Sequence, residues 1–382
     1  GIKTFQALAD EIAAGTIKDT KLIQKANEFV SQWNIEYKKD LEGTNKLIQY
    51  QTSELEKQIS NLQEQKDALS TINDERKKNL ESALFEKGAT KKFLSDINDV
   101  QELIFLINML NERSDKNVGF NIQDSSESIY KHLIGKLSEL SECFFIADAS
   151  TGGLLIKDNY ADLFTCRQFA EDAVKRYSDM GVKCSVFDSS DYKGNIFEYL
   201  YYLGIQYLMI DCTENTYSIA VKRNDILSNS KIRKSAECDI DNPSLRFSIS
   251  NFYCSLNHKE SFGIDDKKLN NLQNLMIYYT ANAQYIVPSK RDSEDSSKLI
   301  MAKTVLENQG ELLTVFTDKP EFDKSYSDEW EYIVLGLEHV LQSAVAGNCN
   351  GIVINPSGER LSLDRATISH IIKTAKTMTF KA

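Results

Sequence analysis

Residues 351–356 read Gly-Ile-Val-Ile-Asn-Pro, an aliphatic run between a glycine and an Asn-Pro pair. A short apolar run that ends in turn residues is typical of a buried strand. Helical spacing precedes it over residues 334–346, and a second strand pattern follows at 360–363 across the turn Pro-Ser-Gly. Asp364 is a suitable cap for a last helix. Together with a strand pattern at 312–316, these elements predict a small mixed α/β module.

A similar order of elements occurs earlier in the chain. Strand patterns lie at 143–146, 154–156, 183–187, 207–210 and 218–221, and helical patterns lie at 165–180 and 195–203. Asp162-Leu-Phe-Thr165 corresponds to Val315-Phe-Thr317, and residues 202–211 correspond to residues 346–355. This repeated order predicts an internal duplication. We expect a first module at 136–235, a connecting segment at 236–262 and a second module at 263–382.

Several of these runs resemble the SseB-domain family. Residues 272–277 are similar to its opening helix, and the run Tyr285-Ile-Val-Pro288 and the run Leu313-Thr-Val-Phe-Thr317 are similar to its first strands. The Asn-Pro strand end at 351–356 resembles the family's best-kept feature. The resemblance covers residues 265–375 and, in weaker form, residues 138–228, where Asp211-Cys212 stands in place of Asn-Pro. It implies a bacterial protein, and the family has no established catalytic residues to carry over.

A heptad pattern marks the N-terminal part of the chain. Leu41, Ile48, Leu55, Leu62 and Leu69 recur at intervals of seven, the spacing that keeps one stripe facing a partner helix. We expect a long helix over 20–87, a stop at Gly88 and a second helix over 90–113 that folds back antiparallel. The predicted fold class is therefore α+β: a long helical hairpin or coiled coil at 1–113, a linker at 114–135, and two SseB-like modules.

Two groups of side chains are predicted to bind a partner. The first group is Leu41, Ile48, Leu55 and Leu62, in the part of the heptad stripe that extends beyond the reach of the second helix. This part would be exposed, and exposed apolar stripes usually bind another surface. The alternative is a helical spacer without a partner. The second group is Phe322, Tyr326 and Trp330, which alternate with acidic residues over 318–331. This pattern fits a protein contact, and packing of Trp330 on the sheet is the alternative.

Composition narrows the classes of partner. The 382 residues carry 45 Lys and Arg against 56 Asp and Glu, a formal net charge of −11. An acidic chain is poorly suited to bind nucleic acid or an anionic membrane. None of the seven cysteines forms a CxxC pair, and no apolar run approaches a membrane span. We therefore expect reduced thiols and a cytoplasmic protein, although a chain that begins at Gly1 is a fragment, an expression remnant or a processed product.

The sequence contains no recognisable catalytic or metal-binding motif. Phosphate loops, GxGxxG runs and HExxH spacings are missing, and the four histidines are far apart in the sequence. Cys349 and His339 could form a nucleophile and base, but a buried cysteine and a surface histidine are the simpler interpretation. We expect neither a cofactor nor a metal.

Function is predicted from these features together. The leading hypothesis is a non-enzymatic adaptor or regulator that binds protein partners. One of these partners could be a second copy of the chain, bound through the coiled coil. The alternative is an enzyme with a thiol- or carboxylate-based site between the two modules.

Overall fold

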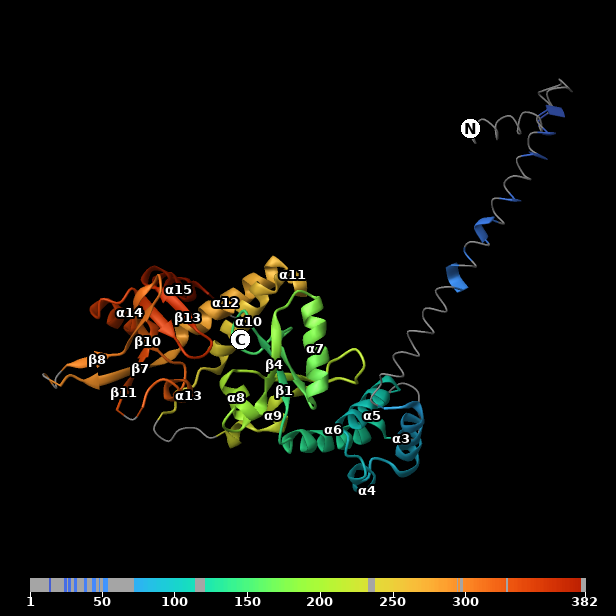
Figure 1. Cartoon of the computed structure of the whole chain (residues 1–382), viewed down its shortest axis with the longest axis horizontal. Coiled ribbons are helices and arrows are strands. Elements are labelled where there is room, and N and C mark those ends of the chain that lie inside the picture. The colour runs from blue at the N-terminus through green and yellow to red at the C-terminus, as the bar shows by residue number, and fades with distance from the viewer. Residues whose placement is uncertain are drawn as a thin grey trace. The chain divides into compact units, whose positions relative to one another are not determined.

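The computed structural model describes residues 72–113, 121–232, 238–293, 298–327 and 329–378, together with residue 295 and scattered positions between 14 and 53. The chain divides into two compact bodies, residues 1–70 and residues 71–382. The larger body combines helices with β-sheets, as the α+β prediction required (Figure 1). In the smaller body, the described positions between 24 and 53 are helical, and they include Ile48, which is 55% exposed. Leu41, Leu55 and Leu62 lie outside the described residues.

The two long N-terminal helices were predicted with the wrong bounds. Asn73 is extended and caps a new helix, α3 (Asp74–Lys87), by accepting a hydrogen bond from the Arg76 N–H. The predicted helix over 90–113 is two helices, α4 (Lys91–Ser95) and α5 (Val100–Glu112), because Asp99 caps α5. Asn and Asp side chains compete for nearby backbone N–H groups, so they favour caps over helix interiors.

The predicted linker over 114–135 is also wrong, since most of it forms helix α6 (Ile122–Ser138). Asn121 caps this helix, and Ile129, Leu133 and Leu137 form its fully buried stripe. Helices α3 to α6 share one apolar core with the sheet that follows them. Residues 74–112 therefore pack with the first sheet instead of forming a separate arm.

The first sheet contains β1 (Phe144–Asp148), β2 (Ile156–Lys157), β3 (Tyr160–Phe164), β4 (Cys184–Asp188), β5 (Tyr207–Ile210) and β6 (Ile219–Lys222). Its order is β4-β1-β3-β5-β6, β2 pairs with β3, and only the β3–β5 pair is parallel. Helix α7 (Arg167–Asp179) covers one face, and α5, α6 and α8 (Ile196–Tyr202) cover the other (Figure 1). The short helix α9 (Arg223–Ile226) follows β6. Together, α5 to β6 and α9 are called the first module below.

The second module begins with α10 (Pro243–Asn257), α11 (Lys259–Phe262) and α12 (Asp266–Asn282). The next elements are β7 (Gln284–Arg291), β8 (Leu299–Met301), β9 (Lys303–Leu306), β10 (Gly310–Val315) and α13 (Lys319–Asp323). The last are β11 (Glu331–Gly336), α14 (Leu337–Ala346), β12 (Gly351–Ile354), β13 (Leu361–Asp364) and α15 (Arg365–Thr377). The predicted strands at 312–316, 351–355 and 360–363 and the Asp364 cap are confirmed.

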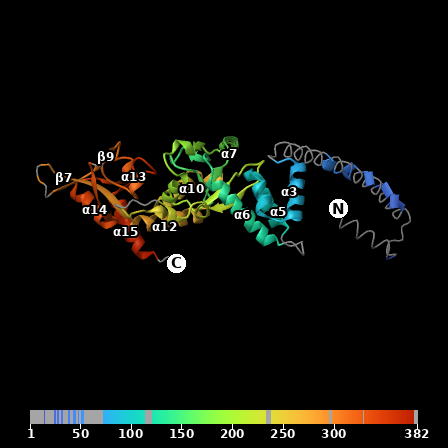
Figure 2. The ribbon, with the colours of Figure 1, turned by 90° about the horizontal axis from the view of Figure 1, so that it is seen from below.

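Two predictions for this region are wrong. The helix expected over 334–346 begins only at Leu337, because Val334 belongs to β11 and pairs with Ile286 of β7. The expected connecting segment at 236–262 contains α10, one of the most deeply buried helices of the described chain. Helix α10 packs against α12 just as α5 packs against α6 (Figure 2).

The two modules have the same strand pairings. The order β4-β1-β3-β5-β6 in the first module corresponds to β11-β7-β10-β12-β13 in the second, where Ile286 and Phe316 join β7 to the end of β10 by two backbone hydrogen bonds. In each module one parallel pair, β3–β5 or β10–β12, is followed by an antiparallel strand and a helix. The carboxyl ends of each parallel pair meet at one edge of the sheet, where polar side chains gather.

Candidate functional site

The Asn-Pro pair ends strand β12 and fixes the end of its parallel neighbour. Asn355 has a positive φ of 47°, a conformation that Asn tolerates better than most residues. Its Oδ1 accepts the Thr317 N–H at 3.0 Å, and its Nδ2 donates to Thr317 Oγ1 at 2.9 Å. The Asn355 side chain thereby satisfies the backbone of the chain leaving β10. This pairing gives a physical reason for an asparagine at the strand end.

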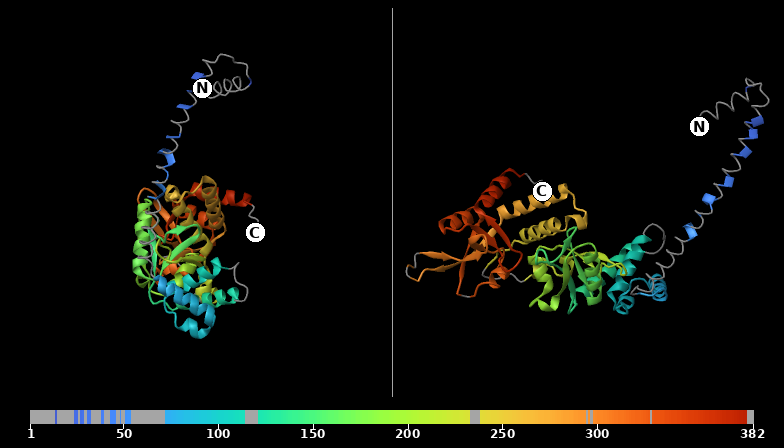
Figure 3. Two further views of the ribbon diagram at one scale, coloured as in Figure 1. Left: turned by 90° about the vertical axis from the view of Figure 1, so that its right-hand side faces the viewer. Right: turned by 45° about the horizontal axis from the view of Figure 1, so that its top comes forward.

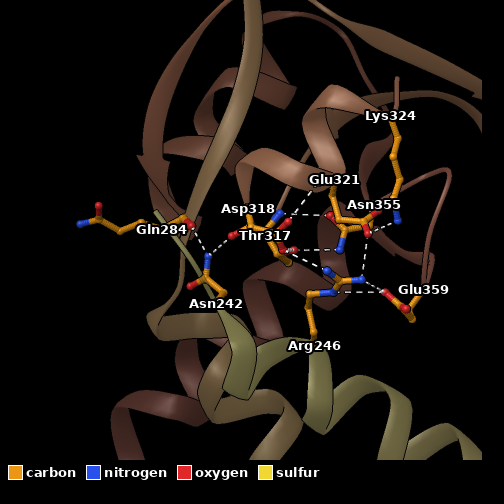
Figure 4. Close-up of polar contacts among 9 residues, drawn as sticks. All are labelled: Asn242, Arg246, Gln284, Thr317, Asp318, Glu321, Lys324, Asn355 and Glu359. Carbon is orange, nitrogen blue, oxygen red and sulfur yellow. Dashed lines mark hydrogen bonds and ion pairs between the residues drawn. The ribbon is translucent and has the colours of Figure 1, made fainter. Parts of the chain in front are cut away.

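A buried arginine from α10 extends this network (Figure 4). The Arg246 guanidinium, on a residue that is 1% exposed, lies 3.2 Å from Asp318 Oδ2, 2.8 Å from Glu321 Oε1 and 2.6 Å from Glu359 Oε2. Thr317 Oγ1 donates to the same Asp318 oxygen at 2.7 Å, so the arginine and the Asn-Pro strand end belong to one network. We call Arg246, Asp318, Glu321 and Glu359 the charged clamp.

Mutual attraction keeps the charged clamp ionised despite its burial. Burial alone would lower the pKa of Arg246, but the carboxylates of Glu359, Asp318 and Glu321 outweigh burial and raise it. Burial would likewise raise the pKa of the Glu359 carboxyl, and the charge and hydrogen bond of Arg246 reverse that effect and lower it. Lys324 adds a second cation, 2.6 Å from Glu321. Because every charge is held by a partner, this network is suited to fix α10 on the second module.

The first module has a counterpart of this network in which a glutamine takes the place of the arginine. Asp211, at a positive φ of 50°, accepts the Thr165 N–H at 2.7 Å and the Thr165 hydroxyl at 2.8 Å, as Asn355 engages Thr317. Gln101 of α5 donates to Asp211 Oδ2 at 2.9 Å and bonds both the N–H and the carbonyl of Tyr217. Burial raises the pKa of Asp211 to about 6. We call α5 and α10 the leading helices of the two modules. In each module, a residue near the start of the leading helix, Gln101 or Arg246, bonds to the residues around the end of the parallel strand pair.

The last turns of α10 contact the first module through Asp148. This fully buried carboxylate accepts hydrogen bonds from Ser150 at 2.7 Å, from Thr151 at 3.0 Å and from Cys254 at 3.3 Å, and it lies 3.0 Å from His258 Nε2. Burial raises the pKa of Cys254 to about 12, so this thiol is protonated at neutral pH. The cluster therefore joins the modules and contains no activated thiol.

The predicted aromatic group is brought together around the sheet. Phe322 is 3% exposed, and its ring lies 5.8 Å from Phe316 and 5.5 Å from Tyr326. Tyr326 and Trp330 are partly buried against the same cluster, and Lys290 lies over the Trp330 ring. The side chain of Phe322 is therefore not accessible to a partner, whereas Trp330, for which packing on the sheet was the alternative, is partly buried. Of the predicted heptad group, the described residues include only Ile48.

Cys349 and His339 are not brought together in the described part of the chain. Cys349 is fully buried, its thiol points to the Gly347 carbonyl at 3.8 Å, and burial raises its pKa. His339 instead lines a separate surface cavity of about 330 Å³ beside Glu338 and Lys376. These contacts provide no support for the thiol chemistry suggested as an alternative.

Sequence reasoning missed Arg246, Glu359 and Gln101. The apolar spacing of Leu245, Ile249 and Phe252 could have revealed α10, and with it the position of Arg246 on a helix. Within the described residues, no group of three or more His, Cys, Asp or Glu side chains is arranged to hold a metal ion. No described helix is long and apolar enough to cross a bilayer.

Comparison with known proteins supports the resemblance in the second module. Residues 270–370 match the family model described as the SseB protein N-terminal domain. The match spans α12 to α15 and includes the Asn355 strand end and most of the charged clamp, but not Arg246. No curated protein and no solved structure matches the chain.

Proposed function

Starting from the SseB N-terminal domain at residues 270–370, we propose that the chain is a non-enzymatic protein-binding adaptor or regulator. In this proposal the second module supplies one binding surface and the predicted coiled-coil arm supplies another. The family resemblance implies a bacterial host. The proposal is supported best by the segment that contains β8 and β9 in the second module, because its apolar side chains are exposed where those of the corresponding strand in the first module are buried.

We also propose that the two modules arose by duplication. The support is the shared strand order, the shared parallel pair, and the helix pair α5–α6 or α10–α12 that precedes each sheet. The duplicated region then begins at the leading helix, upstream of the region in which sequence patterns indicated the repeat. Each helix pair packs into the core of its own module.

Residues 299–306 of the second module, which contain β8 and β9, carry the observation that supports partner binding. Ala302 donates its N–H to Pro288 on β7, as Leu155 in the first module donates its N–H to Ile146 on β1. The two strands therefore occupy corresponding places. In the first module α10 packs on β2, and Ile156 is buried.

In the second module the corresponding strand leaves apolar side chains exposed. Leu299, Ile300 and Val305 are 50%, 40% and 72% exposed. Leu299 and Ile300 belong to the β7–β8 hairpin, which projects from the rest of the module (Figure 3, right). Successive strand residues point to opposite faces, so Leu299 and Ile300 expose apolar groups on both faces of the hairpin, and such exposed groups are typical of binding surfaces. Residues 290–298 carry three basic and three acidic side chains, so this segment has no net charge, and the exposed apolar side chains of the hairpin would match the apolar face of a partner.

A site-specific photo-crosslinker tests this surface. We would place p-benzoylphenylalanine at Ile300 and, as a matched control, at Val345, which is 52% exposed on α14. Irradiation in the native host should give discrete adducts from position 300 and none of the same size from position 345. Identical adducts from both positions, or no adducts at position 300, would contradict the proposal.

A truncation tests the arm separately. Removal of residues 1–70 leaves the larger body intact, whereas removal of residues 1–113 would also remove core residues such as Leu84 and Leu103. If the arm binds a partner, the variant that lacks residues 1–70 should lose a subset of the crosslinked partners. Its near-ultraviolet circular dichroism should remain that of the native chain. An unchanged set of partners would show that the arm is a spacer.

A further inference from the structure

A polar pocket of about 490 Å³ lies at the boundary between the two modules. The Ser150–Thr151 turn of the first module forms one wall, the turn from Pro356 to Ser362 of the second module forms the opposite wall, and α10 contributes Ser250 and Tyr253. A volume of this size suits a small ligand, and such ligands often bind where domains meet. The pocket lies beside the charged clamp, since Glu359 belongs to both.

The first module shows how the same place can be closed. Gln101 and Arg246 both bond to the turn that follows the parallel strands of their own module, so they occupy corresponding positions. Counting along the two helices from these residues, Phe105 corresponds to Ser250 and Asn108 corresponds to Tyr253. The strand registers give the opposite wall. Ile219 pairs with Ile210, and Leu361 pairs with Ile354, so that Tyr217 corresponds to Glu359 and Ser218 corresponds to Arg360.

In the first module these four positions are packed together. The Phe105 ring lies 5.2 Å from the Tyr217 ring, and Asn108 Nδ2 donates to the Ser218 carbonyl at 3.2 Å. In the second module the large Phe105 is replaced by Ser250, and the corresponding space is part of the pocket. The backbones of the two modules correspond at these positions, so the pocket is open in the second module because the side chains that replace Phe105 and Tyr217 are smaller.

The side chains around the opening favour an anionic, hydroxylated ligand. Arg360 is exposed, and it has no ion-pair partner among the described residues. The nearby Glu359 is paired with Arg246 at 2.6 Å, and Arg246 also pairs with Asp318 and Glu321, so Arg360 is the cation at the pocket that remains available to a ligand. Ser250 and Tyr253 add hydroxyl groups to the lining, and Tyr253 has no hydrogen-bond partner among the described residues. Ser150 and Thr151 donate their hydroxyl protons to Asp148, so towards a ligand they offer oxygens that accept hydrogen bonds. Arginine binds carboxylates and phosphates through paired N–H groups.

We infer that this pocket binds a small organic anion that carries several hydroxyl groups, such as a sugar acid or a sugar phosphate. Its carboxylate or phosphate group pairs with Arg360, and its hydroxyl groups bond to the serine, threonine and tyrosine side chains. Because the walls come from both modules, the ligand also bridges them. This inference does not depend on the proposed protein-binding function.

Isothermal titration calorimetry with the full chain tests the inference. The probes are gluconate, a hydroxylated carboxylate, and glucose 6-phosphate, a hydroxylated phosphate, with glucose as the uncharged control. We expect saturable binding of at least one anionic probe and at least tenfold weaker binding of glucose. The preferred probe identifies the anionic group. If neither anion binds, or if glucose binds as well as the anions, the inference is wrong.

Two substitutions that restore first-module residues complete the test. Arg360→Ser removes the exposed cation, and Ser250→Phe refills the pocket as Phe105 does in the first module. Each should weaken binding of the anionic probe at least tenfold. Val345→Ser, on exposed α14, should leave binding unchanged. Arg360 is at the surface, so this variant tests the pocket even if Ser250→Phe fails to fold. Unaltered affinity in Arg360→Ser would overturn the inference.

Discussion

Replacing Arg246 with methionine tests the charged clamp most directly. The substitution keeps a long apolar side chain but removes the cation that lies between 2.6 and 3.2 Å from three buried carboxylates. Loss of one partner from a buried ion pair costs about 3–5 kcal/mol, because the remaining charges are left uncompensated. Lys324 still reaches Glu321, so it compensates one carboxylate of the three. We therefore expect the free energy of unfolding of the second module to fall by about 3–5 kcal/mol at pH 7.

The loss should depend on pH in a defined direction. Arg246 holds the pKa of Glu359 below its ordinary value in the folded wild type. Its stabilising contribution is therefore present above the unfolded pKa of about 4.3 and is lost as the pH falls through the lower, folded pKa. In the variant the charge and hydrogen bond of Arg246 no longer oppose burial, so the pKa of the Glu359 carboxyl rises and the folded variant takes up a proton as the pH falls from 7 towards 5. The difference in stability between variant and wild type should narrow over this range.

Urea unfolding monitored by Trp330 fluorescence measures both effects. The chain has two tryptophans, so Trp33→Phe in every variant makes the signal specific to the second module. Lys303→Met is the matched control, because it removes a cation from the exposed pair with Glu311 at 2.9 Å. An exposed pair contributes less than about 1 kcal/mol. The reasoning is refuted if Arg246→Met costs no more than this control, or if its cost is the same at pH 5 and pH 7.

Three further predictions concern other contacts of the two modules. The pKa of Asp211, raised to about 6, means that its stabilising contribution is complete below the unfolded value of about 3.9 and is lost as the pH rises through 6. Asp211→Asn removes this titration, so the free energy of unfolding of the wild type should fall by about 3 kcal/mol between pH 4 and pH 7 while that of the variant stays flat, a result that urea titrations at several pH values check. Gly204→Ala should cost more stability in thermal unfolding than Gly263→Ala, because both have positive φ but only Gly204 lies against the backbone at the start of α10. Iodoacetamide and mass spectrometry should find Cys254 unmodified in the folded chain and the partly exposed Cys212 labelled, because burial raises the pKa of Cys254 to about 12.

Local patterns were sufficient for much of the second module. The strand at 351–354 is a short aliphatic run with turn residues at both ends, and Asp364 is an ordinary helix cap, so neither prediction required knowledge of distant contacts. The boundary between β11 and α14 lacks such a signal. Gly336 caps α14 without a side-chain hydrogen bond, and the apolar residues run through the boundary without interruption.

The helical signal of α10, the spacing of Leu245, Ile249 and Phe252, is weakened by buried polar residues on the same helix. Its sequence is rich in serine, and Arg246, Ser248, Ser250, Asn251 and Ser255 are buried together with its apolar residues. Polar residues on buried faces hide the periodicity that marks a surface helix. Their burial is possible because the first module packs against one side of α10 and the second module against another.

The candidate sites depend on contacts across long sequence separations. Arg246 and Glu359 are 113 residues apart, and neither belongs to a recognisable motif. The pocket requires a comparison of Phe105 with Ser250, which becomes possible only after the corresponding helices are aligned in space. The Asn-Pro pair was visible in the sequence, but its contact with Thr317 was not.

Helix α10 also determines how a mechanical load passes between the modules. The charged clamp anchors its first turns in the second module, and Asp148 anchors its last turns in the first module. A force that separates the modules therefore pulls on both anchors through a rigid rod. The ionic anchor and the hydrogen-bonded anchor lie in series along α10, so each bears the full tension and the weaker anchor limits the load that the boundary transmits.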